Sequence, residues 1–153
     1  MLRLSKKADY ALMAMKHLAL RGDRGSSSAR EIAALYDIPI ELMAKVLQRL
    51  VRRGLLASYQ GTRGGYELAR RPTQISVADV IQAIDGPVTV TACSSEENQC
   101  EQFAKCNVRD PLWKVRERIL SALGECTIAE LAADPAPASP STTPRPAVFH
   151  PHQ

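Results

Sequence analysis

The stretch SAREIAALYDIPIELMAKVLQRLVRRGLLASYQGTRGGYELA, residues 28–69, decides the fold of this 153-residue chain. Apolar residues recur at helical spacing in two runs, which Asp37-Ile38-Pro39 separates. Two short extended runs follow and flank a glycine-rich segment with Arg63 at its tip, which is the pattern of a β-hairpin. We therefore predict two helices and two strands in the order of a winged helix-turn-helix, at residues 28–36, 40–53, 55–59 and 66–69.

The residues on either side extend this pattern with further helices. Ser5 and Gly22 bound an upstream run with helical spacing, as an N-cap and a stop signal do. Downstream, the polar, cysteine-bearing residues 91–109 indicate a loop, and a long helix begins after it at Pro111. These additional helices are predicted at residues 5–21, 76–84, 111–124 and 128–132.

Together these elements predict a mainly α protein with a β-hairpin wing, a cysteine-bearing loop and a long dimerisation helix. We assign the winged helix-turn-helix domain to residues 1–75, and the cysteine loop with the dimerisation helices to residues 76–133. Residues 134–153 hold six of the ten prolines among small polar residues, so we expect a disordered tail there.

Charge is unevenly distributed along the chain. Residues 1–75 hold 14 of the 20 lysines and arginines and 6 of the 16 acidic residues, so the remainder is acidic. This asymmetry indicates a basic half that faces a polyanion. The predicted helix 40–53 has an apolar back and a basic front, which suits the major groove of double-stranded DNA. A solvated amphipathic helix beside an ordinary hairpin is the alternative.

The predicted DNA contacts come from the N-terminus, the helix-turn-helix and the hairpin tip. Arg63 lies between glycines, where it can enter the minor groove or lie along phosphates. Basic residues near the N-terminus can pair with the DNA backbone. The candidates are Arg3, Lys6, Lys7, Ser28, Pro39, Glu41, Lys45, Gln48, Arg49 and Arg63.

Three of the four cysteines, Cys93, Cys100 and Cys106, fall in the predicted loop with the spacing C-x6-C-x5-C. No run approaches the ~18 apolar residues of a membrane span, and no signal-peptide core follows the basic N-terminus. We therefore expect a cytoplasmic protein with reduced thiols. There, clustered soft thiolates favour a metal centre, with redox-active thiols and inert cysteines as alternatives. Cys126 and His17 are expected to be structural residues.

The chain resembles the IscR/NsrR-type family of bacterial winged-helix regulators, also called the Rrf-two family. The resemblance covers residues 1–133, and the start LRLSKKADYAL most resembles regulators of the SUF iron–sulfur assembly system. The matching runs are LSK, DYA, IA, LVRRGLL, RGGYELA, ISVADVI, AIDG and PLW, at residues 4–6, 9–11, 32–33, 50–56, 63–69, 75–81, 83–86 and 111–113.

The resemblance implies an iron–sulfur cluster bound by Cys93, Cys100 and Cys106, in a homodimer whose cluster occupancy controls promoters. It implies a repressor or regulator of SUF genes that binds a pseudo-palindromic operator, because two-fold protein symmetry is mirrored in the site. Cluster binding would order the loop, and its loss would change the spacing of the two reading helices.

The fourth cluster ligand is where the chain departs from the family. IscR-like members have a histidine three residues after the last cysteine, but Arg109 stands there and cannot ligate. NsrR-like members use a carboxylate from the first helix of the partner subunit, and Asp9 matches that position; Asp110 is a local alternative. Two-iron and four-iron clusters both remain open, and the two-iron form is favoured.

Two other functions compete with this interpretation. A redox-thiol, zinc or nitric-oxide-responsive repressor could use the same fold. A thiol oxidoreductase would need a C-x2-C pair at a helix start, and the sequence has no such pair, no phosphate-binding loop and no plausible triad. We therefore expect a regulator and not an enzyme.

Overall fold

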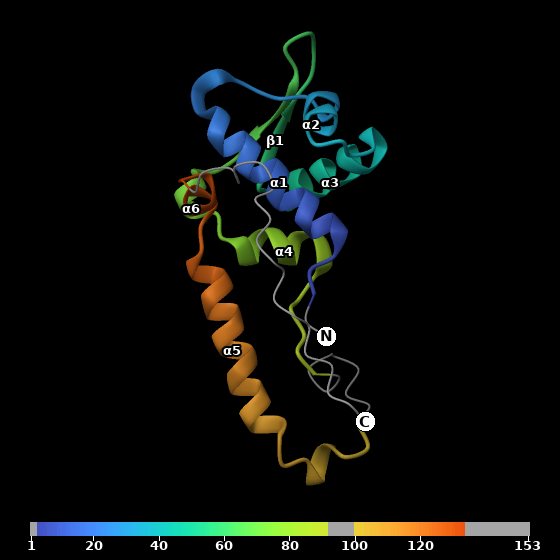
Figure 1. The fold of residues 1–153 in the computed structure, drawn as a ribbon, viewed down its shortest axis with the longest axis vertical. Coiled ribbons are helices and arrows are strands. Elements are labelled where there is room, and N and C mark those ends of the chain that lie inside the picture. Colours follow the sequence, from blue (N-terminus) through green and yellow to red (C-terminus); the bar gives the residue numbers. More distant parts are fainter. Residues whose placement is uncertain (1–2, 92–99, 134–153) are drawn as a thin grey trace, which may run out of the picture.

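The computed structural model describes residues 3–91 and 100–133, which are mainly helical and include a two-stranded antiparallel hairpin (Figure 1). This architecture confirms the predicted winged-helix class. The elements are α1 Lys6–Arg21, η1 Gly22–Arg24, α2 Ala29–Leu35, α3 Ile40–Arg52, β1 Leu56–Tyr59, β2 Gly65–Leu68, η2 Pro72–Gln74, α4 Val77–Asp85, η4 Phe103–Lys105, α5 Arg109–Glu125 and α6 Ile128–Ala133.

Local capping sets the starts of the helices. The Ser5 hydroxyl accepts a hydrogen bond from the amide of Ala8 at the start of α1. Ser28 and Glu31 form the predicted capping box of α2, in which each side chain accepts from the backbone N–H of the other residue. α5 begins at Arg109 rather than at Pro111, because a proline in the first turn has no intrahelical amide bond to lose.

The core lies where α1 crosses α3 and α4. Its largest fully buried side chains come from α1, α2, α3, α4, α6 and the segment just before α4, and they include Met15, Ile32, Met43, Leu47, Leu50, Ile75, Val80 and Ile128. The predicted boundary at residue 75 remains a prediction. Packing nevertheless runs across it, because Val80 of α4 and Ile128 of α6 belong to the same core as Leu47 of α3.

The wing is a hairpin in which Leu56 pairs with Leu68 and Tyr59 with Gly65. Ser27 continues this sheet, because its N–H donates to the Tyr66 carbonyl at 3.1 Å and its own carbonyl accepts from the Tyr66 amide at 2.8 Å. The wing is therefore attached to the chain just before α2, and its position relative to the helix-turn-helix is defined.

Between α4 and α6 the chain makes a long excursion away from this core (Figure 1). We call the described residues 86–91 and 100–126 the excursion, and residues 3–85 with 127–133 the body. The excursion contains η4 and α5, and α5 runs beside the outgoing segment back to α6. Cys93 and the predicted tail at residues 134–153 lie outside the described residues. Within the described ranges, no helix is long and apolar enough to cross a membrane.

Candidate functional site

The outer face of α3 carries a polar ridge opposite its buried side. Met43, Val46, Leu47 and Leu50 are buried, and at 3.6 residues per turn the opposite face of the helix falls on residues 41, 45, 48 and 52. These residues are Glu41, Lys45, Gln48 and Arg52, and all are exposed. We call them the ridge. One negative, one neutral and two positive side chains in a row can read base edges and contact phosphates.

Pro39 lies at the N-terminal end of the ridge as the N-cap of α3, and its carbonyl accepts from the Met43 amide at 3.0 Å. Pro39 and Ile40 are exposed, so this end of the helix is open to a groove. Lys45 and Gln48 follow one and two turns later. The structure therefore presents four of the predicted contacts, from Pro39 to Gln48, along one accessible line.

Arg49 differs from its neighbours on α3. Its Nε donates to the carbonyl oxygen of Ala83 in α4 at 2.8 Å, so the guanidinium lies against the body on the flank of the ridge. Arg52, which is not among the contacts predicted from the sequence, occupies the ridge position. Helical spacing from Glu41 could have identified it, because residues 41, 45, 48 and 52 recur on one face.

Arg63 lies at the exposed tip of the wing, where close backbone contacts require glycine. A side chain at Gly64 would place its Cβ 2.5 Å from the carbonyl oxygen of Tyr59, and one at Gly65 would lie 2.7 Å from the Ser27 backbone. The Ser26 hydroxyl donates to the Arg63 carbonyl at 2.9 Å, which ties the tip to the body. The arginine is thus carried on a narrow, anchored projection.

Ser28 lies at the start of α2, beside the wing. Its hydroxyl oxygen accepts from the Glu31 amide at 3.1 Å, and its hydroxyl proton remains a donor that a phosphate oxygen can accept. Arg3, Lys6 and Lys7 are exposed at the start of α1. The structure therefore places the predicted contacts at the starts of α1 and α2, on α3 and on the wing. It brings four of them together around one hollow of about 230 Å³, and the lining of that hollow does not include the others; the four are Lys7, Lys45, Gln48 and Arg49.

His17 of α1 contacts the residues on either side of α2, Ser27 and Tyr36. Its Nε2 lies 3.3 Å from the hydroxyl of the fully buried Ser27, and its Nδ1 lies 3.3 Å from the hydroxyl of Tyr36. Burial lowers the pKa of His17 below its usual value, nearby Arg21 adds to this effect, and Glu31 opposes it. Neutral imidazole can donate from one nitrogen and accept at the other, so it satisfies both hydroxyls in a structural role.

Two of the predicted thiol ligands flank the short turn η4. Cys100 and Cys106 are half-buried free thiols, and the Cys100 carbonyl accepts from the Phe103 amide at 3.1 Å within the turn. Both sulfur atoms are therefore available as soft donors, which suits the chemistry of an iron–sulfur cluster. Across the residues that the structure describes, no three potential metal-ligating side chains converge, and the third thiol, Cys93, lies outside them.

The two carboxylates predicted as fourth ligands have different surroundings. Asp110 forms an ion pair with Arg109 Nε at 2.9 Å beside the cysteine turn. Asp9 lies in the first turn of α1 in the body, whereas η4 is at the far end of the excursion (Figure 1). Cys126 is half-buried where α5 ends, and its carbonyl accepts from the Val77 amide at 2.8 Å.

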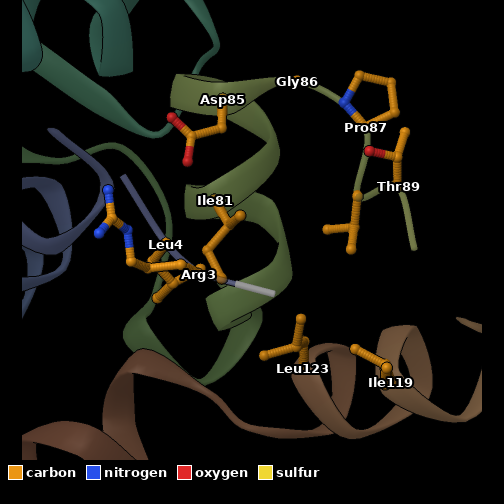
Figure 2. Close-up of a pocket in the computed structure, with 10 residues that line it drawn as sticks. Arg3, Leu4, Ile81, Asp85, Gly86, Pro87, Thr89, Ile119 and Leu123 are labelled. Atoms are coloured by element: carbon orange, nitrogen blue, oxygen red, sulfur yellow. The ribbon is translucent and has the colours of Figure 1, made fainter. Parts of the chain in front are cut away.

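A hollow of about 530 Å³ separates the body from the excursion. Figure 2 shows Leu4 and Arg3 from the N-terminus, Ile81 from α4, and Ile119 and Leu123 from α5 around it. The lining is mainly apolar, so it can accept an apolar side chain. The hollow lies along the seam where α5 also packs against α4 of the body.

The chain is similar to known transcriptional regulators in sequence and structure. Residues 4–134 match the Rrf2 family model, described as an iron-dependent transcriptional regulator. The HTH-type transcriptional regulator IscR of Xenorhabdus nematophila is 35% identical over 131 residues, 85% of this chain and 79% of that protein. The structure is similar to CymR, the global cysteine regulator of B. subtilis, with TM-score 0.70 and 29% identity over 87% of this chain and 98% of that chain. For IscR of T. potens, the TM-score is 0.66 and the identity 28% over 85% of each chain.

Proposed function

The chain belongs to the Rrf2 family of iron-dependent transcriptional regulators, and on that premise we propose that it senses an iron–sulfur cluster and thereby controls SUF iron–sulfur assembly genes. It is a DNA-binding regulator and not an enzyme, as are the proteins that it matches. One observation carries the proposal: the cysteine turn lies on an excursion that leaves from the end of α4 and whose other end, at Cys126, is hydrogen-bonded to the start of α4 in the DNA-binding body.

The proposed cluster ligands are Cys93, Cys100 and Cys106, with Asp9 of the partner subunit as the fourth. We favour Asp9 over Asp110 because Asp110 is already paired with Arg109. A two-iron cluster is the preferred form. When bound, the cluster supplies a centre whose thiolate ligation is sensitive to iron supply, oxidation and nitric oxide. The chain's own contribution is to hold two thiols on one short turn, accessible from solvent.

The proposed DNA contact combines the ridge with the wing. The ridge enters the major groove, Arg63 contacts the adjacent minor groove or its phosphates, and Arg3, Lys6 and Lys7 pair with the backbone. Ser28 donates its hydroxyl proton to a phosphate. Since the remainder of the chain is acidic, the basic residues of the body orient it toward DNA.

The proposed assembly is a homodimer formed through α5. This helix spans 17 residues, and none of them is buried in the chain. Trp113 and Val115 are 51% and 42% exposed and, being two residues apart, lie on different sides of α5, so each side offers apolar surface to a second α5. A dimer with two-fold symmetry presents two ridges and two wings, and therefore requires a pseudo-palindromic operator.

Purification without oxygen tests the cofactor. We expect coloured protein with bound iron, and we expect Cys106→Ala to lose both colour and iron. Cys126→Ala is the matched control and should keep both, because that cysteine lies outside the proposed ligand set. Colourless protein with stoichiometric zinc, or a Cys106→Ala variant that keeps its visible absorbance, would exclude the iron–sulfur assignment in favour of a zinc or redox-thiol regulator.

Binding to DNA duplexes tests the target. The metal-loaded and metal-free forms are titrated against a duplex from the suf promoter region and a scrambled duplex of equal length, by fluorescence anisotropy at fixed salt. We expect at least about tenfold preference for the promoter duplex in one of the two forms. Equal affinity for both duplexes in both forms would exclude SUF control at that promoter.

A further inference from the structure

α4 is fastened to the excursion at both of its ends. At its start, the Val77 amide donates to the Cys126 carbonyl at 2.8 Å, and the Ile128 amide donates to the Ile75 carbonyl at 2.9 Å. At its other end the chain leaves α4 through Gly86 toward the cysteine turn. Figure 1 shows this path, which goes out from one end of α4 and returns along α5 to the other.

The two limbs of the excursion are also joined to each other. Arg116 of α5 donates from Nε to the Val88 carbonyl at 3.1 Å, and Val88 lies three residues after the last residue of α4. A shift of α5 or of the cysteine turn therefore acts on the backbone next to Asp85.

The last turn of α4 in turn holds two DNA-facing elements. The Asp85 carboxylate accepts from the Ser5 amide at 3.2 Å and from the Ser5 hydroxyl at 2.5 Å, at the start of α1. The Ala83 carbonyl accepts from Arg49 Nε of α3 at 2.8 Å. Carbonyls in the last turn of a helix lack intrahelical partners, and a cation there is favoured by the helix dipole, so the arginine satisfies a group that would otherwise be open.

The same place also contains a hollow. A hollow of about 230 Å³ lies between α1, α3 and the end of α4, where Lys7, Arg49 and Ile84 meet. None of the residues that line it is acidic. Here α3 is held to α4 by a directional hydrogen bond beside a space and not by close packing alone.

We propose that the last turn of α4, Ala83–Asp85, is the joint through which the excursion sets the position of the recognition helix, and that Arg49 is a positioning residue rather than a DNA contact. This inference rests on the proposed function, since it names the route by which the cysteine turn would act on the ridge. Ser5 is the second attachment of the joint, because it connects Asp85 to the basic start of α1.

Salt dependence separates a positioning residue from a phosphate contact. Affinity for DNA falls as the salt concentration rises, and each phosphate that the protein neutralises makes the slope of log affinity against log salt steeper by about 0.9. We expect Arg49→Met to lower affinity for the operator by at least about tenfold, while the slope and the affinity for a scrambled duplex stay unchanged. Lys45→Met on the ridge is the matched comparison, and it should lower the slope. A slope reduced by about 0.9 in Arg49→Met would show that Arg49 binds phosphate, and would overturn the assignment.

Coupling is measured as the ratio of operator affinities of the metal-loaded and metal-free forms. We expect Arg49→Met, and independently Ser5→Ala, to reduce this ratio by at least about fivefold, with iron content and visible absorbance as in the wild-type protein. Arg53→Met, the same change at the end of α3, should leave the ratio intact. A wild-type ratio in both joint variants would overturn the joint.

The two proposals fail in distinguishable ways. If the wild-type protein itself shows no difference between its two forms, metal sensing is wrong and the joint has no signal to transmit. The slope measurement on metal-free Arg49→Met still decides whether Arg49 positions α3 or contacts phosphate. Near-ultraviolet circular dichroism of each variant identifies any loss of folding. Ser5→Ala provides a milder change, because it removes a hydrogen bond to Asp85 in the last turn of α4 and leaves Arg49 in place.

Discussion

The body and the excursion each contain a long helix with an apolar stripe, but the stripe is buried in the body and exposed in the excursion. α3 spans 13 residues and buries four of them in the core, whereas α5 spans 17 residues and buries none. The stripe of α3 is covered by α1, α2 and α4 of the same chain. The body can therefore fold by its own packing, while the stripe of α5 needs something beyond the described residues to cover it.

The largest expected difference between the two regions is in the cost of deleting an apolar side chain. Leu47→Ala in α3 should lower the free energy of unfolding by about 2–5 kcal/mol, because the deletion leaves a cavity in a closed core. Trp113→Ala in α5 should lower it by less, about 1 kcal/mol, because half of this side chain is already exposed. Urea unfolding at concentrations where the protein is monomeric measures both. Equal losses of unfolding free energy in the two variants would show that α5 is packed as closely as α3.

The second test concerns self-association. Trp113→Ala with Val115→Ala should weaken the dimer by at least about tenfold, or about 1.4 kcal/mol, since aromatic and apolar anchors dominate such interfaces. Sedimentation equilibrium gives the dissociation constant. Lys114→Ala, an exposed polar change between them, is the control and should have little effect. An unchanged dimer in the double variant would place the interface elsewhere.

A third, smaller effect comes from two serines. Ser76 caps α4 in the body, where its hydroxyl accepts from the Asp79 amide at 3.0 Å, so Ser76→Ala should cost about 1 kcal/mol of stability. Ser121 of α5 donates to Glu125 at 2.8 Å on an exposed surface. Ser121→Ala should cost less than about 0.5 kcal/mol in the same urea titration. A reversed order would mean that α5 is stabilised within the chain.

The smallest effect is the pH dependence due to His17. Its pKa is lower in the folded protein than the ordinary value of 6.5, so the unfolded chain binds the proton more readily. Its contribution to stability is therefore present above pH 6.5 and is lost as the pH falls through the folded pKa. Urea titrations between about pH 5 and pH 8, the range in which histidine ordinarily titrates, measure this effect. The free energy of unfolding should depend less steeply on pH in His17→Gln than in the wild-type protein. An identical profile would rule out His17 as the source.

Most of the fold was predictable because its signals are local. The capping box of Ser28 and Glu31, the stop at Gly22 and the glycines around Arg63 act within a few residues, and the structure has each where the sequence indicated it. Apolar spacing likewise predicted the buried face of α3. The error of two residues at the start of α5 is of the kind that local signals leave open.

The candidate site was less predictable, because charge and exposure on one helix face do not reveal distant partners. Arg49 and Arg52 are alike in sequence, yet the Ala83 carbonyl, 34 residues away, binds only the first in the contacts described. The spacing of Cys100 and Cys106 indicated soft ligands on one loop. Convergence with Cys93 and with Asp9 of the partner subunit involves residues beyond those that the structure describes, and it remains a prediction.

By itself, the sequence determined the order of the elements, the basic face of α3 and the presence of clustered thiols, since periodicity, capping and residue chemistry are properties of neighbouring residues. Only the tertiary structure decided that α4 carries the excursion at both ends and that its last turn holds Ser5 and Arg49. The partners in those contacts are backbone carbonyls and a carboxylate far along the chain. Packing of α1, α3 and α4 around one core, and no local pattern, brings them within hydrogen-bonding distance.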